Sequence, residues 1–388
     1  MAKVFIVSGC RTPIGNFQGQ FEKYPATELG TIAVSEAIRR ANLKPEDVNQ
    51  CIMGQVLTAG QGQNCARQTS INANIPNLSP AYTINMLCGS GLKSVALGFQ
   101  AIRNEDCNIL VAGGQESMTR AHHSTYLRGA KLGALNLSDT VLNDGLTDFF
   151  NNIHMGNTAE HLAKTYNVSR QLQDEFALNS QIKVTEAIKN GYFDKEIVGV
   201  PEKRTKELII KDEFPKTDSS LEKLSKLRPA FDSKGTVTAG NASGINDGAA
   251  AVVLANVEEV KQRNLNPLAE IIAFAEVGID PLCMGLGPIQ AITKLLQKTG
   301  WTQEEVDLYE LNEAFAVQSL ICMKELGLDP SKVNVTGGAI ALGHPIGASG
   351  TRCLVTLIYN LIRLGKRKGV VALCIGGGMG IAMAVELC

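Results

Sequence analysis

A Gly-rich turn followed by an amphipathic helix pattern and an apolar strand pattern occurs twice in this chain, and this repeat limits the folds that it can adopt. In the first copy the turn covers residues 88–91, and apolar side chains recur at helical spacing over residues 92–102. An apolar run over residues 108–112 then predicts a strand that ends at Gly113 and Gly114. Alternating helices and strands of this kind favour an α/β fold.

The second copy lies near the C-terminal end of the chain. Its turn covers residues 343–350, a helical pattern runs over residues 351–364, and a strand pattern covers residues 369–373. An early strand pattern at residues 4–8 likewise has a counterpart at residues 271–275. We therefore expect two similar halves that pair about a pseudo-two-fold axis and bring both turns to one site.

The middle of the chain differs from both copies. Residues 201–228 contain eight Lys or Arg and six Asp or Glu side chains, a density that is typical of a solvated face. An apolar run over residues 248–254 then restores strand character. The predicted units are an N-terminal half of residues 1–118 plus 241–267, an insertion of residues 119–240, and a C-terminal half of residues 268–388.

The charge balance excludes some classes of partner. Lys and Arg total 37 against 38 Asp and Glu, which gives a net charge of −1. A nucleic-acid-binding protein normally shows a strong basic excess, so we expect no nucleic-acid partner.

The ten cysteines and the apolar runs favour a reduced, intracellular protein. The cysteines form no C-x-x-C pair and no local cluster with metal-ligand spacing, so we expect no metal site. The strand pattern at residues 3–7 begins without a basic leader, so we expect no secretory or transit segment. The apolar run at residues 370–385 is short for a membrane span and contains four glycines, so we expect a buried strand and a turn there.

Cys88 lies between an apolar stretch and the first turn of a predicted helix, in the motif Cys-Gly-Ser-Gly-Leu. A helix N-terminus presents unpaired N–H groups and a partial positive charge, which lower the pKa of a thiol and favour nucleophilic attack. Gly89 and Gly91 leave room for a substrate beside the sulfur. The same pattern also fits a buried structural cysteine, and the local sequence leaves both interpretations open.

His344 lies in a charge-free, Gly-rich stretch and is one of only five histidines. We expect its imidazole to be neutral there, so that it can take a proton from Cys88. A lone histidine is more often a structural residue than a catalyst, and that alternative also stands.

Two further positions follow predicted strands. Cys374 precedes a glycine cluster at residues 376–380, whose exposed N–H groups suit an oxyanion but whose spacing is wrong for a dinucleotide. Asn312 follows an apolar strand pattern at residues 306–309, where an amide can hold a water or polarise an oxygen. Its alternative is a helix N-cap, with Glu313 starting the next helix.

Together these four motifs resemble those of the thiolase family, and in particular its biosynthetic acetoacetyl-CoA thiolases. The resemblance implies that Cys88 is the acylated nucleophile, that His344 activates it, and that Cys374 is an acid/base. It implies that Asn312 and His344 build one oxyanion hole with a water, and that the backbone N–H groups of Cys88 and Gly376 build another. It also implies two similar βαβαβαββ halves in a layered α-β-α-β-α core with a loop-domain insertion.

The resemblance extends to the substrates. It implies condensation of two acetyl-CoA to acetoacetyl-CoA and CoA, and the reverse thiolysis, with coenzyme A as a substrate and product and no tightly bound cofactor. Met155, Met284 and Phe315 would limit the acyl chain, Ser243 would contact the pantetheine arm, and Lys216 would meet the nucleotide phosphates. The expected tunnel lining also includes Leu146, His154, Phe231, Ala239 and Ile245.

The resemblance also implies an assembly and a compartment. Residues 119–141 resemble a tetramerisation loop, so we expect a homotetramer built as a dimer of dimers. No membrane partner is expected, and the location is cytoplasmic, or the mitochondrial matrix if a transit peptide has been removed. Gln115 departs from the family, which commonly has Met there, and we attach no consequence to this.

Five other functions are weighed against this one. The first two are a 2-methylacetoacetyl-CoA thiolase of branched-chain metabolism and a degradative, long-chain 3-ketoacyl-CoA thiolase. The third is a condensing enzyme of the ketoacyl-synthase type, which pairs its cysteine with two histidines, and Asn312 and Cys374 speak against it. The fourth is a catalytically silent lipid-binding or scaffolding protein on the same fold. The last is a metal or redox protein built on the ten cysteines, and their spacing speaks against it.

Overall fold

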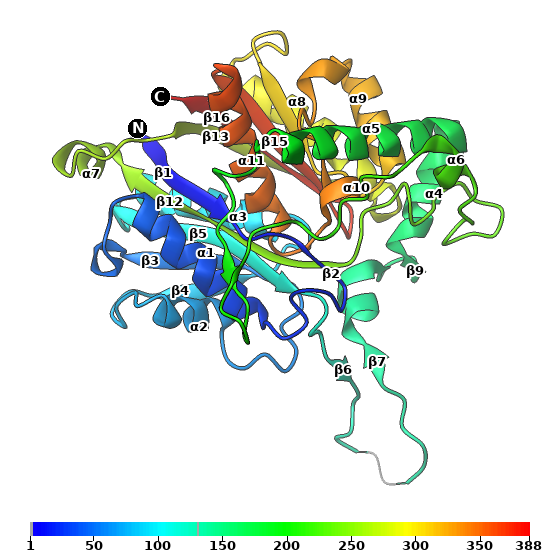
Figure 1. Ribbon diagram of the computed structural model, residues 1–388, viewed down its shortest axis with the longest axis horizontal. Helices are drawn as coiled ribbons and strands as arrows, with labels where there is room; N and C mark the ends of the chain where they lie inside the picture. The colour runs from blue at the N-terminus through cyan, green and yellow to red at the C-terminus, as the bar shows by residue number, and fades with distance from the viewer. Residues whose placement is uncertain (1–2, 130–131) are drawn as a thin grey trace.

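A twisted sheet of ten strands runs through the whole molecule (Figure 1). The computed structural model describes residues 3–129 and 132–388. The strand order is β14-β15-β16-β13-β1-β12-β5-β3-β4, and β2 pairs with β12. The strands are β1 (Val4–Arg11), β2 (Gly15–Asn16), β3 (Gln50–Gly54), β4 (Ala81–Ile84), β5 (Ile109–Ser117), β12 (Asn246–Asn256), β13 (Ala269–Gly278), β14 (Leu308–Leu311), β15 (Lys368–Ile375) and β16 (Met379–Leu387).

The sheet consists of two halves joined by one short antiparallel contact. Phe5 pairs with Glu270 and Ile6 with Ala269, which links β1 to β13. In the N-terminal half β3 runs parallel to β4 and β5, and in the C-terminal half β14 runs parallel to β15. The expected strands at residues 4–8 and 271–275 are therefore confirmed as the two strands at the junction.

Helices cover both faces of each half of the sheet, so that three layers of helices alternate with the two halves of the sheet. Two helices, α3 (Ser90–Arg103) and α11 (Ser349–Leu364), lie between the two halves. Along β15 the side chains alternate, so that Val371 and Leu373 pack inward on α3 and α11, while Val370 and Ala372 pack outward. The outer layers are α1 (Ala26–Arg40) with α2 (Cys65–Asn72), and α8 (Gly287–Thr299) with α9 (Ala316–Leu326).

Both predicted helices after the Gly-rich turns are confirmed, but one strand boundary is wrong. Gly113 and Gly114 do not end a strand, because they pair with Ala251 and Ala250 inside β5. A Cβ atom on Gly114 would lie 2.1 Å from the Gly347 carbonyl oxygen, so the glycine serves close packing and not a turn. The late apolar run contains the expected strand, β15, and the expected glycine turn, but it continues into a second strand, β16, which pairs antiparallel with β15 and was not expected.

Residues 119–240 form small hairpins and helices beside the layers. The hairpin of β6 (His123–Ser124) and β7 (Ser138–Asp139) projects from the core, and residues 130–131 of this loop lie outside the described residues (Figure 1). The charged run at residues 201–228 is mostly exposed, as expected. The other elements here are the π-helix Val141–Leu146, β8 (Thr147–Asp148), β9 (Ile153–His154), α4 (Met155–Thr165), α5 (Arg170–Lys189), β10 (Val200–Pro201), β11 (Leu208–Ile209) and α6 (Leu221–Ser225).

Short helices connect the remaining parts of the chain. They are α7 (Val257–Gln262), α10 (Ala339–Leu342) and the 3-10 turns Pro45–Asp47, Pro281–Leu286 and Pro330–Lys332. Within residues 3–129 and 132–388, no helix is long and apolar enough to cross a membrane.

Candidate active site

Cys88 lies two residues before the start of α3, on a tightly held turn. Ser90, the first residue of α3, accepts a hydrogen bond from the Met86 backbone N–H at 2.8 Å and donates one to the Leu87 carbonyl at 2.6 Å. Leu87 adopts a left-handed backbone conformation with φ of 47°, which is costly for a leucine. The turn therefore sets the direction of the Cys88 side chain at the expense of local strain.

Glycines bring the two Gly-rich turns into contact. A Cβ atom on Gly89 would come within 2.4 Å of the Ile375 side chain, next to Cys374. Cβ atoms on Gly54 and Gly91 would lie 2.8 and 3.0 Å from the carbonyl oxygen of Gly347, in the turn that carries His344. The expectation that both turns meet at one site is confirmed, because only glycine permits these backbone approaches.

Burial dominates the ionisation of the Cys88 thiol, although backbone N–H groups from both halves favour its charged form. Burial raises the pKa of Cys88 to about 11, and hydrogen bonds from the backbone N–H groups of Gly376 and of Cys88 itself lower it only in part. The negative charge of Glu116 adds a smaller upward shift to this pKa. The expected lowering of the thiol pKa by the helix N-terminus is therefore wrong, because desolvation outweighs the N–H groups.

His344 is buried and held through both ring nitrogens. Nδ1 lies 2.5 Å from the Ser349 hydroxyl oxygen, and Nε2 lies 3.4 Å from Asn312 Nδ2. Because an amide nitrogen can only donate, Nε2 is the acceptor and the ring proton sits on Nδ1. Burial, and then the charge of Arg352, lower the pKa of His344 to about 3, so the imidazole is neutral as expected.

Asn312 directly follows β14 and is not a helix cap. The next helix, α9, begins only at Ala316 and has Phe315 at its N-cap position. The helix-cap interpretation of Asn312 is therefore wrong, and its buried side chain is free to face His344.

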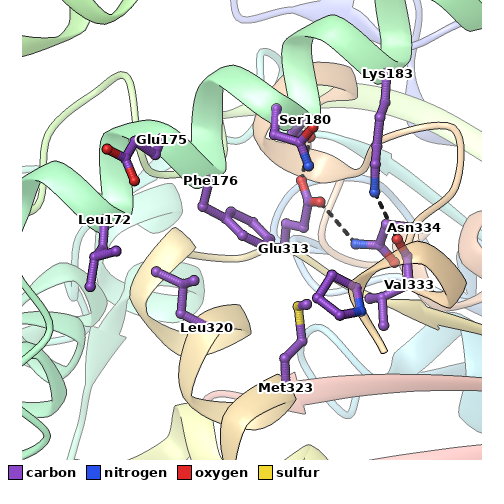
Figure 2. A pocket seen from close by; sticks show the side chains of 12 residues that line it. Leu172, Glu175, Phe176, Ser180, Lys183, Glu313, Leu320, Met323, Val333 and Asn334 are labelled. Atoms are coloured by element: carbon purple, nitrogen blue, oxygen red, sulfur yellow. Dashed lines mark hydrogen bonds between the residues drawn. The ribbon is translucent and has the colours of Figure 1, made fainter. Parts of the chain in front are cut away.

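Asn334 holds the backbone of the residue before Asn312 and the side chain of the residue after it. Its amide accepts a hydrogen bond from the Leu311 N–H at 2.8 Å and donates to the Leu311 carbonyl and the Glu313 carboxylate, each at 2.9 Å. Glu313 also accepts from the Ser180 hydroxyl at 2.7 Å (Figure 2). Sequence patterns gave no sign of Asn334 or Ser349, because their roles depend on partners from other elements.

The cavity shown in Figure 2 lies beside the hydrogen bonds of Asn334, Glu313 and Ser180 and not at the meeting point of the two turns. It measures about 240 Å³ and is lined by α5 and α9 residues together with Glu313. None of Cys88, Asn312, His344 or Cys374 lines it.

Cys374 lies one residue before the end of β15 and is fully buried. It packs in an apolar cluster with Met155, Met284 and Phe315. Burial raises the pKa of the Cys374 thiol well above its ordinary value, and the neighbouring Cys88 thiol raises it further. The two thiols thus come from opposite halves of the fold and lie close enough for the charge of one to act on the pKa of the other, and three apolar side chains pack with Cys374.

The predicted tunnel residues fall into three groups. His154 stacks on Phe231 with ring centroids 4.7 Å apart, and Phe231 meets the edge of Phe315 at 6.3 Å. Leu146 and Ile245 pack in the cluster that contains Cys88.

Ala239 and Lys216 form the third group and lie farther out. Both line a cavity of about 150 Å³, together with Phe214, Leu227 and Lys223. The backbone N–H of Ser243 donates to the Ala314 carbonyl at 2.9 Å, which ties the segment before β12 to the Asn312 loop.

Comparison with known proteins extends along the whole chain. The family model for the thiolase N-terminal domain matches residues 4–258, and that for the thiolase C-terminal domain matches residues 265–387. A curated relative, the cytosolic acetyl-CoA acetyltransferase of Mus musculus, is 53% identical over 388 residues, which cover 99% of this chain and 98% of the relative.

Two solved structures have nearly the same fold. The acetyl-CoA acetyltransferase of Bacillus anthracis has a TM-score of 0.97 at 41% identity, over 100% of this chain and 99% of the other. Human mitochondrial 3-ketoacyl-CoA thiolase in complex with CoA has a TM-score of 0.96 at 41% identity, over 100% and 98%.

Proposed function

Because this chain belongs to the thiolase family, we propose that Cys88, His344, Asn312 and Cys374 perform its chemistry. The chain is an acyltransferase that condenses two acetyl-CoA to acetoacetyl-CoA and CoA, and catalyses the reverse thiolysis. The observation that best supports the residue assignment is the close approach of the Cys88 turn to the segments that carry Cys374 and His344. A Cβ atom on Gly89 would lie 2.4 Å from the Ile375 side chain, and one on Gly91 would lie 3.0 Å from the Gly347 carbonyl oxygen.

In the first half-reaction Cys88 takes the acetyl group. Its sulfur adds to the thioester carbonyl while His344 Nε2 accepts the thiol proton. The oxygen that becomes negative is stabilised by the N–H groups of Cys88 and Gly376. The bond to the CoA sulfur then breaks, and Cys374 gives its proton to that sulfur, which leaves Cys374 as a thiolate.

In the second half-reaction the Cys374 thiolate removes a proton from the methyl group of a second acetyl-CoA. A thiol whose pKa is raised by burial is a strong base once ionised, as a weak carbon acid requires. The enolate oxygen accepts hydrogen bonds from protonated His344 and from a water held by Asn312. The enolate carbon attacks the acetyl group, and Cys88 leaves as a thiolate and recovers its proton from His344.

Coenzyme A binds to the insertion of residues 119–240. This insertion acts as a loop domain between an N-terminal half, residues 1–118 plus 241–267, and a C-terminal half, residues 268–388. The His154–Phe231 stack and Ser243 meet the pantetheine arm, while the outer cavity at Ala239 and Lys216 takes the nucleotide. A solved relative at 41% identity contains bound CoA, which supports this assignment.

Met155, Met284 and Phe315 restrict the acyl pocket to short chains. They are 7%, 4% and 8% exposed and pack against Cys374, which leaves little space for a long acyl group. This packing favours acetoacetyl-CoA over long-chain substrates.

The active form is a homotetramer, and its location is cytoplasmic. The projecting hairpin exposes Tyr126 at 83%, Leu132 at 103% and Leu137 at 64%, a group of apolar side chains that suits contact with other subunits. The relative from Mus musculus is named as cytosolic, which supports the location.

Thiolysis with purified protein tests the assignment. CoA is supplied with acetoacetyl-CoA, 2-methylacetoacetyl-CoA or 3-ketooctanoyl-CoA, and the Cys88→Ala variant is the control. We expect fast cleavage of acetoacetyl-CoA, slow cleavage of the longest substrate, and none by the variant. Comparable cleavage of the methylated substrate would indicate branched-chain metabolism, and faster cleavage of the longest would indicate a degradative enzyme.

A further inference from the structure

We propose that Cys353 is a positioning residue that sets the orientation of the Asn312 side-chain amide toward His344. This inference rests on the proposed function, in which Asn312 and His344 share one oxyanion site. Cys353 lies in α11, fully buried, and its Sγ atom lies 3.8 Å from Asn312 Oδ1.

An asparagine amide can adopt two orientations of nearly equal shape, and its hydrogen-bond partners decide between them. Within residues 3–129 and 132–388, Cys353 supplies the only side-chain donor to Asn312 Oδ1. The opposite edge of the amide then presents Nδ2 to His344 Nε2 at 3.4 Å. The thiol therefore favours the orientation of Asn312 in which Nδ2 faces the imidazole, in the same sense as the contact of Ser349 with His344 Nδ1.

Arg352 leaves the Cys353 thiol able to donate its proton toward Asn312. Its Nη2 atom donates to Cys353 Sγ at 2.8 Å, so the sulfur accepts on that side and has its proton left for Asn312. Burial raises the pKa of Cys353 to about 12, so the thiol keeps this proton. Arg352 is itself fixed by Glu310 at 3.0 Å, on the strand that leads to Asn312.

The orientation matters because it supports the imidazole tautomer that the Ser349 contact also favours. With Nδ2 facing it, Nε2 acts as the acceptor and Nδ1 keeps the proton, which leaves Nε2 able to receive the proton of Cys88. If the amide turned over, Oδ1 would face Nε2 and favour the tautomer with the proton on Nε2, which cannot act as a base.

Three variants separate the hydrogen bond from the packing. Cys353→Ser keeps a donor, Cys353→Ala removes it at nearly the same side-chain size, and Cys353→Val removes it while filling the space. We expect the Ala and Val variants to lose about three- to tenfold in kcat for thiolysis of acetoacetyl-CoA, with KM for CoA little changed. The Ser variant should stay within about twofold of the original kcat.

The controls distinguish this inference from the proposed function. Mass spectrometry of the unmodified protein with acetyl-CoA tests whether Cys88 is acetylated, and a failure there would overturn the function itself. With Cys88 acetylated, equal losses in the Ser, Ala and Val variants would show that only packing at residue 353 matters. No loss in any of them would likewise overturn the role of Cys353.

Discussion

The Nδ1 atom of His344 lies 2.5 Å from the hydroxyl oxygen of Ser349, five residues further along the chain at the start of α11. The same hydroxyl lies 3.0 Å from the Pro345 carbonyl, to which it can donate its own proton. The ring of His344 is thus held by a residue of its own turn and by Asn312, which directly follows β14.

Replacement of Ser349 by Ala should lower kcat without a matching change in KM. The hydroxyl is the only side-chain partner of His344 Nδ1 among the described residues. Its loss allows the proton of the neutral ring to sit on either nitrogen. We expect roughly a tenfold loss in kcat for thiolysis. Ser319→Ala is the matched control, because the Ser319 hydroxyl is buried without a hydrogen-bond partner and should leave kcat unchanged.

Alkylation of Cys88 should depend steeply on pH. A thiol with a pKa of about 11 is almost wholly protonated at neutral pH, and only the thiolate reacts. The rate of iodoacetamide labelling on the Cys88 peptide should therefore rise about tenfold per pH unit between about pH 7 and 10. Mass spectrometry of that peptide measures it, with Cys88→Ala as the blank, and a plateau below about pH 8 would contradict a neutral thiol of raised pKa.

A side chain at residue 89 should move the thiols of Cys88 and Cys374 apart. The Cβ atom in Gly89→Ala would meet Ile375 Cδ1 at 2.4 Å, so either the Cys88 turn or the end of β15 must move. We expect a loss of at least about tenfold in kcat. Ile375→Val removes the clashing atom, so the double variant should recover much of the activity. Equal activity of the single and double variants would argue against this contact as the cause.

Enlarging the acyl pocket should change chain-length preference. Met155→Ala or Met284→Ala opens space beside Cys374, which should raise turnover of 3-ketohexanoyl-CoA relative to acetoacetyl-CoA by roughly tenfold. Met323→Ala provides the comparison, since Met323 lines the separate cavity of Figure 2. An unchanged ratio in both pocket variants would show that other residues limit the chain.

Glu116 should make stability fall as pH rises through neutrality. Burial raises the pKa of Glu116 from 4.5 to about 7, although the backbone N–H groups of Val56, Leu57 and Gly347 donate to it. The folded state thus binds this proton more tightly, so the stabilisation is complete below pH 4.5 and is lost as pH rises through about 7.

Urea unfolding of the original protein and of Glu116→Gln measures this effect. The Gln side chain does not titrate. The unfolding free energy of the original protein should therefore fall by roughly 3 kcal/mol relative to that of the variant between about pH 4.5 and 8. A difference that is independent of pH would show that Glu116 does not titrate in this range.

The sequence alone singled out the residues to which we assign the chemistry, because each stands in a short motif whose residue types have direct chemical meaning. Cys88, His344 and Cys374 all lie next to glycine-rich turns, and Asn312 follows an apolar strand. The repeat of turn, helix and strand also predicted that the two turns meet, and the contacts of Gly54 and Gly91 with Gly347 confirm this. Helical and strand periodicity located α3, α11, β1 and β13, since local spacing of apolar residues is enough for that.

Tertiary structure decided how these residues ionise and what holds them. The sequence indicated a lowered pKa for Cys88 from the helix N-terminus, but burial by both halves raises it. Whether Asn312 caps a helix or faces His344 depended on where α9 begins, and the partners Ser349, Asn334 and Cys353 became visible only once distant segments packed together. Local sequence determines which groups are present, whereas desolvation and hydrogen bonding depend on every segment that surrounds them, and only the folded chain brings those segments together.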